Sequence, residues 1–170
     1  AERDLREADF AGKPFAPIFR EAKEAGLRIT VHAGEWGGAA NVREAIEILG
    51  ADRIGHGVRV LEDPNIVALA KERGTVFEVC VTSNYQSGVT PSIEAHPIRN
   101  MIDAGLICTI NTDDPSISRI SLSDEFQLVN QQLGMPLSRL KELTMNAVNA
   151  AFVSETQKEK LVAQFKKGLE

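Results

Sequence analysis

The sequence contains only two cysteines, Cys80 and Cys108, and both lie in apolar, strand-like surroundings. Such cysteines are typical of buried thiols in a reducing compartment rather than of a disulfide framework. No apolar stretch approaches the roughly 18 residues that a membrane span needs, and the first residues do not resemble a signal peptide. We therefore expect a cytoplasmic protein that makes no contact with a membrane.

Positive charge is not in excess either. The chain has 19 Lys and Arg residues against 24 Asp and Glu residues, which gives a formal net charge of −5. Non-specific binding to nucleic acid requires clustered Lys and Arg, so no nucleic-acid partner is expected. The hydrophobic share of 43% over 170 residues is instead typical of one soluble globular domain.

Four short, mostly apolar runs alternate with segments of helical spacing. Near-continuously apolar strands that alternate with helices indicate a parallel sheet covered by helices. No glycine-rich phosphate-binding loop follows any of these runs, which favours a (β/α)8 barrel over an open doubly wound sheet. The runs span residues 28–33, 52–57, 75–84 and 106–114, and the helical segments span residues 15–25, 39–49, 65–71 and 96–104.

The number of strands predicts only part of a barrel. A complete (β/α)8 barrel needs about 250 residues, whereas this chain has 170 and shows four good strands. We therefore expect about half of a barrel, with residues 1–170 forming a single incomplete domain. The last part of the chain predicts helices only, over residues 124–133, 137–152 and 156–167. The first residue is alanine, and residues 1–9 show no clear helix or strand pattern, so we expect a further segment upstream.

The first predicted strand ends in His32-Ala33-Gly34-Glu35. An imidazole at a strand end can present a neutral nitrogen to Zn²⁺. Gly34 can adopt a positive φ, so the carboxyl group of Glu35 can face the same site. A Glu in a dry pocket has a raised pKa, which suits a general acid near neutral pH. The alternative is a His bonded to the backbone beside a helix-capping Glu.

Two later strand ends carry further candidates. His56 lies between two glycines, so a ligand could approach its imidazole closely; a buried structural histidine is the alternative. Asp113 and Asp114 follow the last apolar run and must point in different directions, so one could reach a metal while the other meets a substrate. Their alternative is a capping pair before a proline. His96, at the start of a helical segment, is interpreted as structural.

Taken together, these residues resemble the adenosine deaminase family of the amidohydrolase superfamily. The resemblance implies the C-terminal half of a (β/α)8 barrel and a catalytic Zn²⁺ bound by His32 and Asp113. It also implies two further His ligands from residues outside this chain, because the family's His-x-His motif has no counterpart here. The matching stretches are Thr30–Glu35, Arg53–Gly57, Cys80–Asn84 and Asn111–Pro115.

The resemblance also implies roles in the reaction. Glu35 would protonate N1 of the purine, His56 would stabilise the zinc-bound hydroxide, and Asp113 would help to take its proton. Asp114 would pair with N7 of the base. Gly12 would contact N3, although the family's acidic pair after this position is replaced by Lys13-Pro14.

The implied activity is zinc-dependent hydrolytic deamination of adenosine or 2′-deoxyadenosine to inosine and ammonia, as part of a larger enzyme. The alternatives are deamination of a related aminopurine, such as adenine or 6-aminodeoxyfutalosine, and a non-catalytic binding domain. With two of four metal ligands, the isolated chain is expected to have little activity. Its exposed strand edges predict self-association or binding of a complementing N-terminal half.

Overall fold

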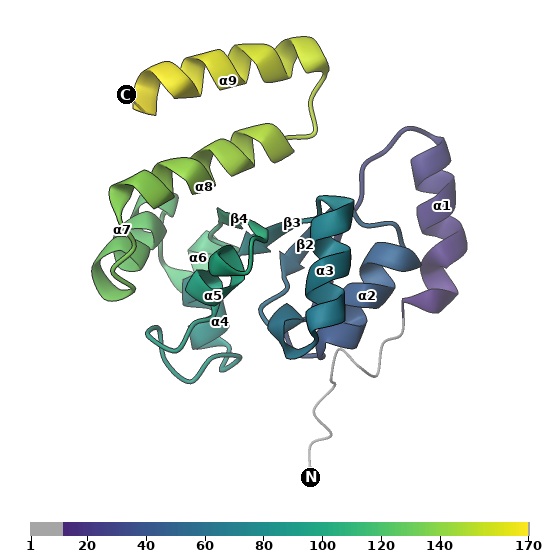
Figure 1. Ribbon diagram of the computed structural model, residues 1–170, viewed down its shortest axis with the longest axis horizontal. Helices are drawn as coiled ribbons and strands as arrows, with labels where there is room; N and C mark the ends of the chain where they lie inside the picture. Colours follow the sequence, from purple (N-terminus) through teal and green to yellow (C-terminus); the bar gives the residue numbers. More distant parts are fainter. Residues whose placement is uncertain (1–11, 170) are drawn as a thin grey trace.

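The computed structural model describes residues 12–169 and contains one parallel four-stranded sheet (Figure 1). The strands lie in the sheet in the same order as in the chain. All three neighbouring pairs are parallel, which confirms the predicted sheet type. The strands are β1 (Thr30–Ala33), β2 (Arg53–His56), β3 (Val76–Val79) and β4 (Ile107–Ile110).

Helices and short turns connect the strands. The helix between β2 and β3 illustrates how the sequence sets its bounds. The carboxylate of Asp63 accepts the backbone N–H of Asn65 at its start, and Gly74 ends it in the left-handed conformation. A 3₁₀ turn at Lys13–Phe15 and α1 (Ala16–Glu24) precede β1. The connecting helices are α2 (Ala39–Glu47), α3 (Pro64–Arg73), α4 (Val81–Gln86) and α5 (Ile98–Asp103), with a 3₁₀ turn at Val60–Glu62.

The part of the chain after β4 is helical, as the sequence predicts. A short helix, α6 (Pro115–Ser118), is followed by α7 (Leu122–Gln132), α8 (Leu137–Ala150) and α9 (Glu155–Leu169). Ser121 and Asp124 form a capping box that starts α7. Figure 1 shows α1 beyond α2 at one end of the molecule and α9 beyond α8 at the other.

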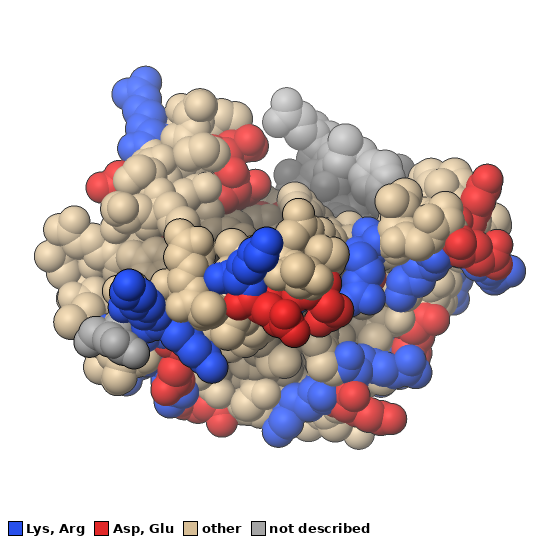
Figure 2. Space-filling model, turned by 90° about the horizontal axis from the view of Figure 1, so that it is seen from above, with Lys and Arg blue, Asp and Glu red and all other residues tan. Residues whose placement is uncertain are grey.

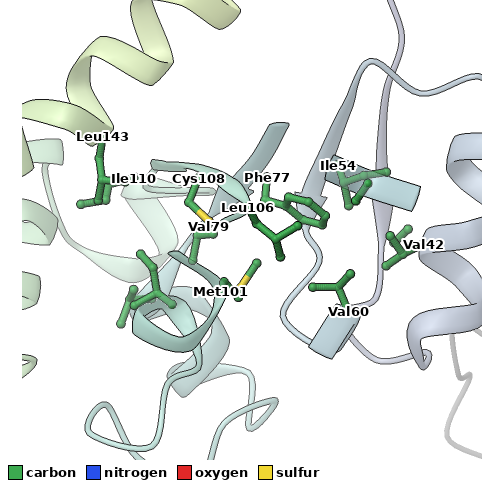
Figure 3. Close-up of a cluster of buried hydrophobic side chains, with 14 of the residues drawn as sticks. Val42, Ile54, Val60, Phe77, Val79, Met101, Leu106, Cys108, Ile110 and Leu143 are labelled. Carbon is green, nitrogen blue, oxygen red and sulfur yellow. The ribbon is translucent and has the colours of Figure 1, made fainter. Parts of the chain in front are cut away.

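The register of the sheet separates a buried row from a row that belongs to the candidate site. Ile54, Phe77 and Cys108 lie side by side on β2, β3 and β4 and are all fully buried. Figure 3 shows them packed with side chains from the helices, among them Val42 and Met101. Burying each large apolar side chain contributes about 1.5–3 kcal/mol. This core holds the strand ends in fixed relative positions.

The other row of the register crosses all four strands through His32, Gly55, Glu78 and Thr109. Side chains alternate between the two faces of a strand, so these residues share the face opposite the buried row. This face carries the candidate site.

One predicted strand is wrong in its second half. The apolar run over residues 75–84 predicts a single strand, but the strand ends at Val79 and α4 begins at Val81. The cause is distant in sequence: the buried carboxylate of Glu125 on α7 accepts the backbone N–H of Thr82 at 2.8 Å and also bonds its hydroxyl group. An acceptor at the first turn satisfies a free helical N–H, so this contact stabilises a helix there.

The surface carries both signs of charge. On the face drawn in Figure 2, Lys and Arg side chains lie among Asp and Glu side chains. Among residues 12–169, no helix has both the length and the apolar character to cross a membrane.

Candidate functional site

Three predicted site residues lie together at the carboxyl ends of β1 and β2. One ligand atom from each of His32, Glu35 and His56 can be chosen so that all lie within 4.8 Å of one another. Nε2 of His56 is 3.5 Å from Oε2 of Glu35, and the two imidazole rings meet edge to face with centroids 4.9 Å apart. His56 is buried, Glu35 is half-buried and His32 is exposed. The structure therefore brings these residues into one site.

Gly34 makes this grouping possible between His32 and Glu35. Its φ of +67° lies in the left-handed region, which glycine adopts without strain. A Cβ at this position would lie 2.5 Å from Cγ2 of Val42. The turn thus brings Glu35 back over the strand end, as the sequence predicts.

Gly55 makes room for the metal-ligand candidate itself. It pairs with His32 across the sheet, and a Cβ on Gly55 would overlap Cδ2 of the His32 ring and lie 3.0 Å from Nε2. From the sequence, the glycines beside His56 predict room for a ligand to approach. The structure shows that the space at Gly55 is occupied by the neighbouring imidazole.

Two site residues have unusual backbone conformations. His56 has φ of +61° and Asp113 has φ of +57°, although neither is glycine. Such conformations cost about 1–3 kcal/mol each and persist where the surrounding structure imposes them. His56 is the last residue of β2 and Asp113 follows the end of β4, so both unusual conformations occur where the chain leaves the sheet.

Asp113 lies across the sheet from the cluster. His32, His56 and Asp113 all line one cavity of about 440 Å³. The Asp113 carboxylate accepts a hydrogen bond from the hydroxyl of Ser83 at 2.7 Å. Cys80 lines the same cavity, but burial and the nearby Asp113 raise the pKa of its thiol. In the absence of a bound metal ion, the Cys80 thiol is therefore protonated at neutral pH.

The donor set of this cavity fits a zinc ion. Imidazole nitrogen and carboxylate oxygen are both ordinary zinc ligands, and catalytic sites commonly combine them. His32 and Asp113 supply one of each from the ends of β1 and β4, and the row of small and polar residues between them leaves the space open.

Comparison with known proteins identifies the family. The sequence profile of the adenosine deaminase family matches residues 3–167. The chain belongs to the adenosine deaminase family. An adenosine deaminase from Aliivibrio fischeri is 40% identical over 156 residues, which cover 90% of this chain and 47% of that protein. The chain therefore spans about half the length of the relatives it matches.

Solved structures give the family fold. An adenine deaminase from Arthrobacter aurescens superposes with a TM-score of 0.91 at 29% identity, covering 98% of this chain and 51% of that one. An amidohydrolase from Burkholderia ambifaria with bound Zn gives a TM-score of 0.88 at 33% identity, covering 98% and 47%. The four strands and their helices thus correspond to about half of a deaminase barrel, as predicted.

Two predicted substrate contacts of the family lie outside the main cluster. Asp114 is exposed and precedes α6. Gly12 lines a separate hollow of about 60 Å³ with His32, and its nearest neighbours are Leu49 and Glu44 of the α2 region. The residues just before Gly12, which carry part of its resemblance to the family, lie outside the described residues. Both assignments stay predictions.

Two further residues at the site, Asn84 and His96, are not predicted as functional from the sequence. The Asn84 amide nitrogen is 3.1 Å from Nδ1 of His56 and 3.5 Å from Oε1 of Glu35, and its oxygen is 3.2 Å from Nε2 of His96. Asn84 belongs to the Cys80–Asn84 stretch that resembles the family. That resemblance could have drawn attention to it, but a strand assignment gave no reason to aim it at His56.

Proposed function

We propose that this chain is part of a zinc-dependent enzyme that hydrolyses adenosine or 2′-deoxyadenosine to inosine and ammonia. The observation that carries the proposal is the grouping of His32, Glu35 and His56 at the ends of two adjacent strands, with Asp113 lining the same cavity as the two histidines. A fold alone does not require these groups together. The family and its deaminase members support the same reaction class.

In this reaction, water adds to C6 of the purine and the 6-amino group leaves as ammonia. A bound zinc ion would supply a water molecule of lowered pKa at neutral pH. Glu35 is placed beside His56 and half-buried, which suits a carboxyl group that delivers a proton to ring nitrogen N1. Asp113 accepts the proton of the attacking water, and Asp114 pairs with N7.

The proposed partner is a complementing N-terminal half of the barrel. Within the described residues, β1 and β4 each pair on one side only. Beside β4, an apolar groove of about 610 Å³ runs between α7, α8 and α9, and includes Phe126 and Phe165. Unpaired edges and exposed apolar surface favour association. A complementing half would cover both and bring the remaining histidine ligands; self-association is the alternative.

The test is reconstitution. The chain is purified with Zn²⁺, alone and with the N-terminal half of the Aliivibrio relative, and adenosine loss is followed by ultraviolet absorbance. We expect turnover only with the complement, and loss of at least about 100-fold in Glu35→Gln, since general acid catalysis contributes about 10²–10⁴-fold. Glu47→Gln, an exposed carboxyl on α2, is the matched control. Normal turnover by Glu35→Gln would refute the proton-donor role.

A second candidate substrate is adenine, favoured by the TM-score of 0.91 to an adenine deaminase. The same assay run in parallel with adenosine, adenine and 6-aminodeoxyfutalosine assigns the substrate. A complex that forms and binds zinc, yet converts none of these, would favour the non-catalytic binding role instead.

A further inference from the structure

Behind the candidate site, two buried polar side chains that the proposed chemistry does not use, Asn84 and His96, lead to His56. His96, Asn84 and His56 are 4%, 0% and 2% exposed, so each must satisfy its polar atoms within the protein. They follow one another through hydrogen bonds of 3.2 Å and 3.1 Å. Glu35 lies at the end of this series of hydrogen bonds, near both Asn84 and His56.

The direction of these hydrogen bonds is set by a backbone group. The N–H of Ile98 donates to Nδ1 of His96 at 3.2 Å. Since a backbone N–H can only donate, Nδ1 of His96 carries no proton, and the proton of the neutral ring lies on Nε2. Burial, with His56 nearby, lowers the pKa of His96 to about 4, so this ring is neutral at physiological pH.

The orientation of the Asn84 amide follows from that of His96. Nε2–H of His96 donates, so the atom of Asn84 that faces it is the carbonyl oxygen. The amide NH₂ group then points the other way, toward Nδ1 of His56 and Oε1 of Glu35. The three contacts of this buried amide are thereby consistent with a single orientation of its oxygen and nitrogen.

The last link determines where His56 carries its proton. Nδ1 of His56 faces an amide N–H and must accept, because a proton there would place two donors against each other. We propose that Asn84 and His96 are positioning residues that hold the proton of neutral His56 on Nε2, the nitrogen that faces Glu35. The direction of all these hydrogen bonds follows from the backbone N–H of Ile98, which can only donate.

The consequence for the reaction rests on the proposed function. With its proton on Nε2, neutral His56 can donate a hydrogen bond to an oxygen in the site, but Nε2 cannot accept a proton. The proton lost by the attacking water must therefore go to a carboxylate. Asn84 and His96 would thus separate the roles of the groups at the site: His56 donates a hydrogen bond, and the acids move protons.

The experiment reads the proton position directly, without turnover. The chain has three histidines, so two-dimensional ¹H–¹⁵N spectra of its imidazoles contain only three ring systems. Variants that replace one histidine at a time assign them. At about pH 8, above the ordinary imidazole pKa of about 6.5, we expect His56 and His96 each to show a protonated Nε2 and an unprotonated Nδ1.

The decisive variant is Asn84→Asp, which replaces the donor amide with an acceptor of the same shape. The carboxylate accepts from both rings, so the proton of His56 should move to Nδ1 while His96 keeps its pattern. Asn100→Asp, exposed on α5, adds the same charge elsewhere and should change neither ring. A purely structural role for Asn84 would not exchange the two nitrogen signals of His56.

Two results would overturn the proposal. One is a wild-type spectrum with the proton of His56 on Nδ1, which decides the matter even if Asn84→Asp does not fold. The other is an Asn84→Asp variant that folds and keeps that proton on Nε2. Neither depends on adenosine turnover, so failure of this inference is distinguishable from failure of the proposed deamination.

Discussion

The contact between Thr82 and Glu125 predicts a specific loss of stability. The hydroxyl of Thr82 bonds the fully buried carboxylate of Glu125, and both belong to the junction of α4 with α7. Thr82→Val keeps the shape and β-branching of the side chain but removes the hydroxyl donor. A hydrogen bond to a charged group contributes about 1.5–3 kcal/mol, and the carboxylate would lose one partner in a buried place. We expect the free energy of unfolding to fall by about that amount.

The same chain provides a matched control. Thr90 is 6% exposed, as is Thr82, but its hydroxyl has no hydrogen-bond partner within the described residues. Thr90→Val therefore removes a buried hydroxyl without breaking a bond, and we expect stability to be unchanged or slightly raised. Urea denaturation followed by circular dichroism measures both variants, and equal slopes against urea concentration would show that only stability has changed.

Equal losses in the two variants would refute the reasoning, because they would reflect the general effect of replacing Thr by Val in a buried position. The difference between the variants isolates the bond to Glu125. That bond matters beyond stability, since α4 carries Ser83 and Asn84, which contact Asp113 and His56.

Three further predictions follow from the core, the sheet and the buried histidine. Leu143→Ala on α8 removes a side chain that is 2% exposed and should lower the free energy of unfolding by about 2–5 kcal/mol. Leu137→Ala, at a side chain that is 67% exposed, is the control and should change it by no more than about 0.5 kcal/mol. Urea denaturation measures both variants. Gly55→Ala should displace His32 and weaken zinc binding by the reconstituted barrel about 10–100-fold, measured by chelator competition; unchanged affinity would contradict the overlap argument. The lowered pKa of His96, about 4 in the folded state, means that the unfolded chain binds its proton first as pH falls below about 6.5. Stability should therefore be complete above that pH and fall by about 3 kcal/mol on the way to pH 4, a loss that urea titrations at several pH values would detect and that His96→Gln should reduce.

The sequence predicts the sheet well because its signals are local. Each strand is a short apolar run, and each following helix has its own spacing and stop signal, as at Gly74. The grouping of His32 with Glu35 is predictable for the same reason, because Gly34 between them allows the turn. Parallel order then brings His56 to the same edge.

The failures come from contacts between distant segments. Val81 and Thr82 are β-branched and continue the apolar run on local grounds, whereas the helix that forms there depends on Glu125, 43 residues after Thr82. The role of His96 is equally remote from its local pattern, which indicates only a helix start. The positioning role proposed for His96 depends on its hydrogen bond to the amide of Asn84, and that amide is correctly placed only when residues 81–86 are helical.

The site has two parts: the metal ligands, whose arrangement depends on what covers the sheet edges, and the proton-handling residues, which the chain's own core holds in place. The metal ligands His32 and Asp113 are both exposed in the described structure, so their arrangement depends on whatever covers the sheet edges. Glu35 and His56, in contrast, are held by Asn84 from within the chain's own core. Zinc affinity should therefore require the complementing half, whereas the proton position on His56 should not.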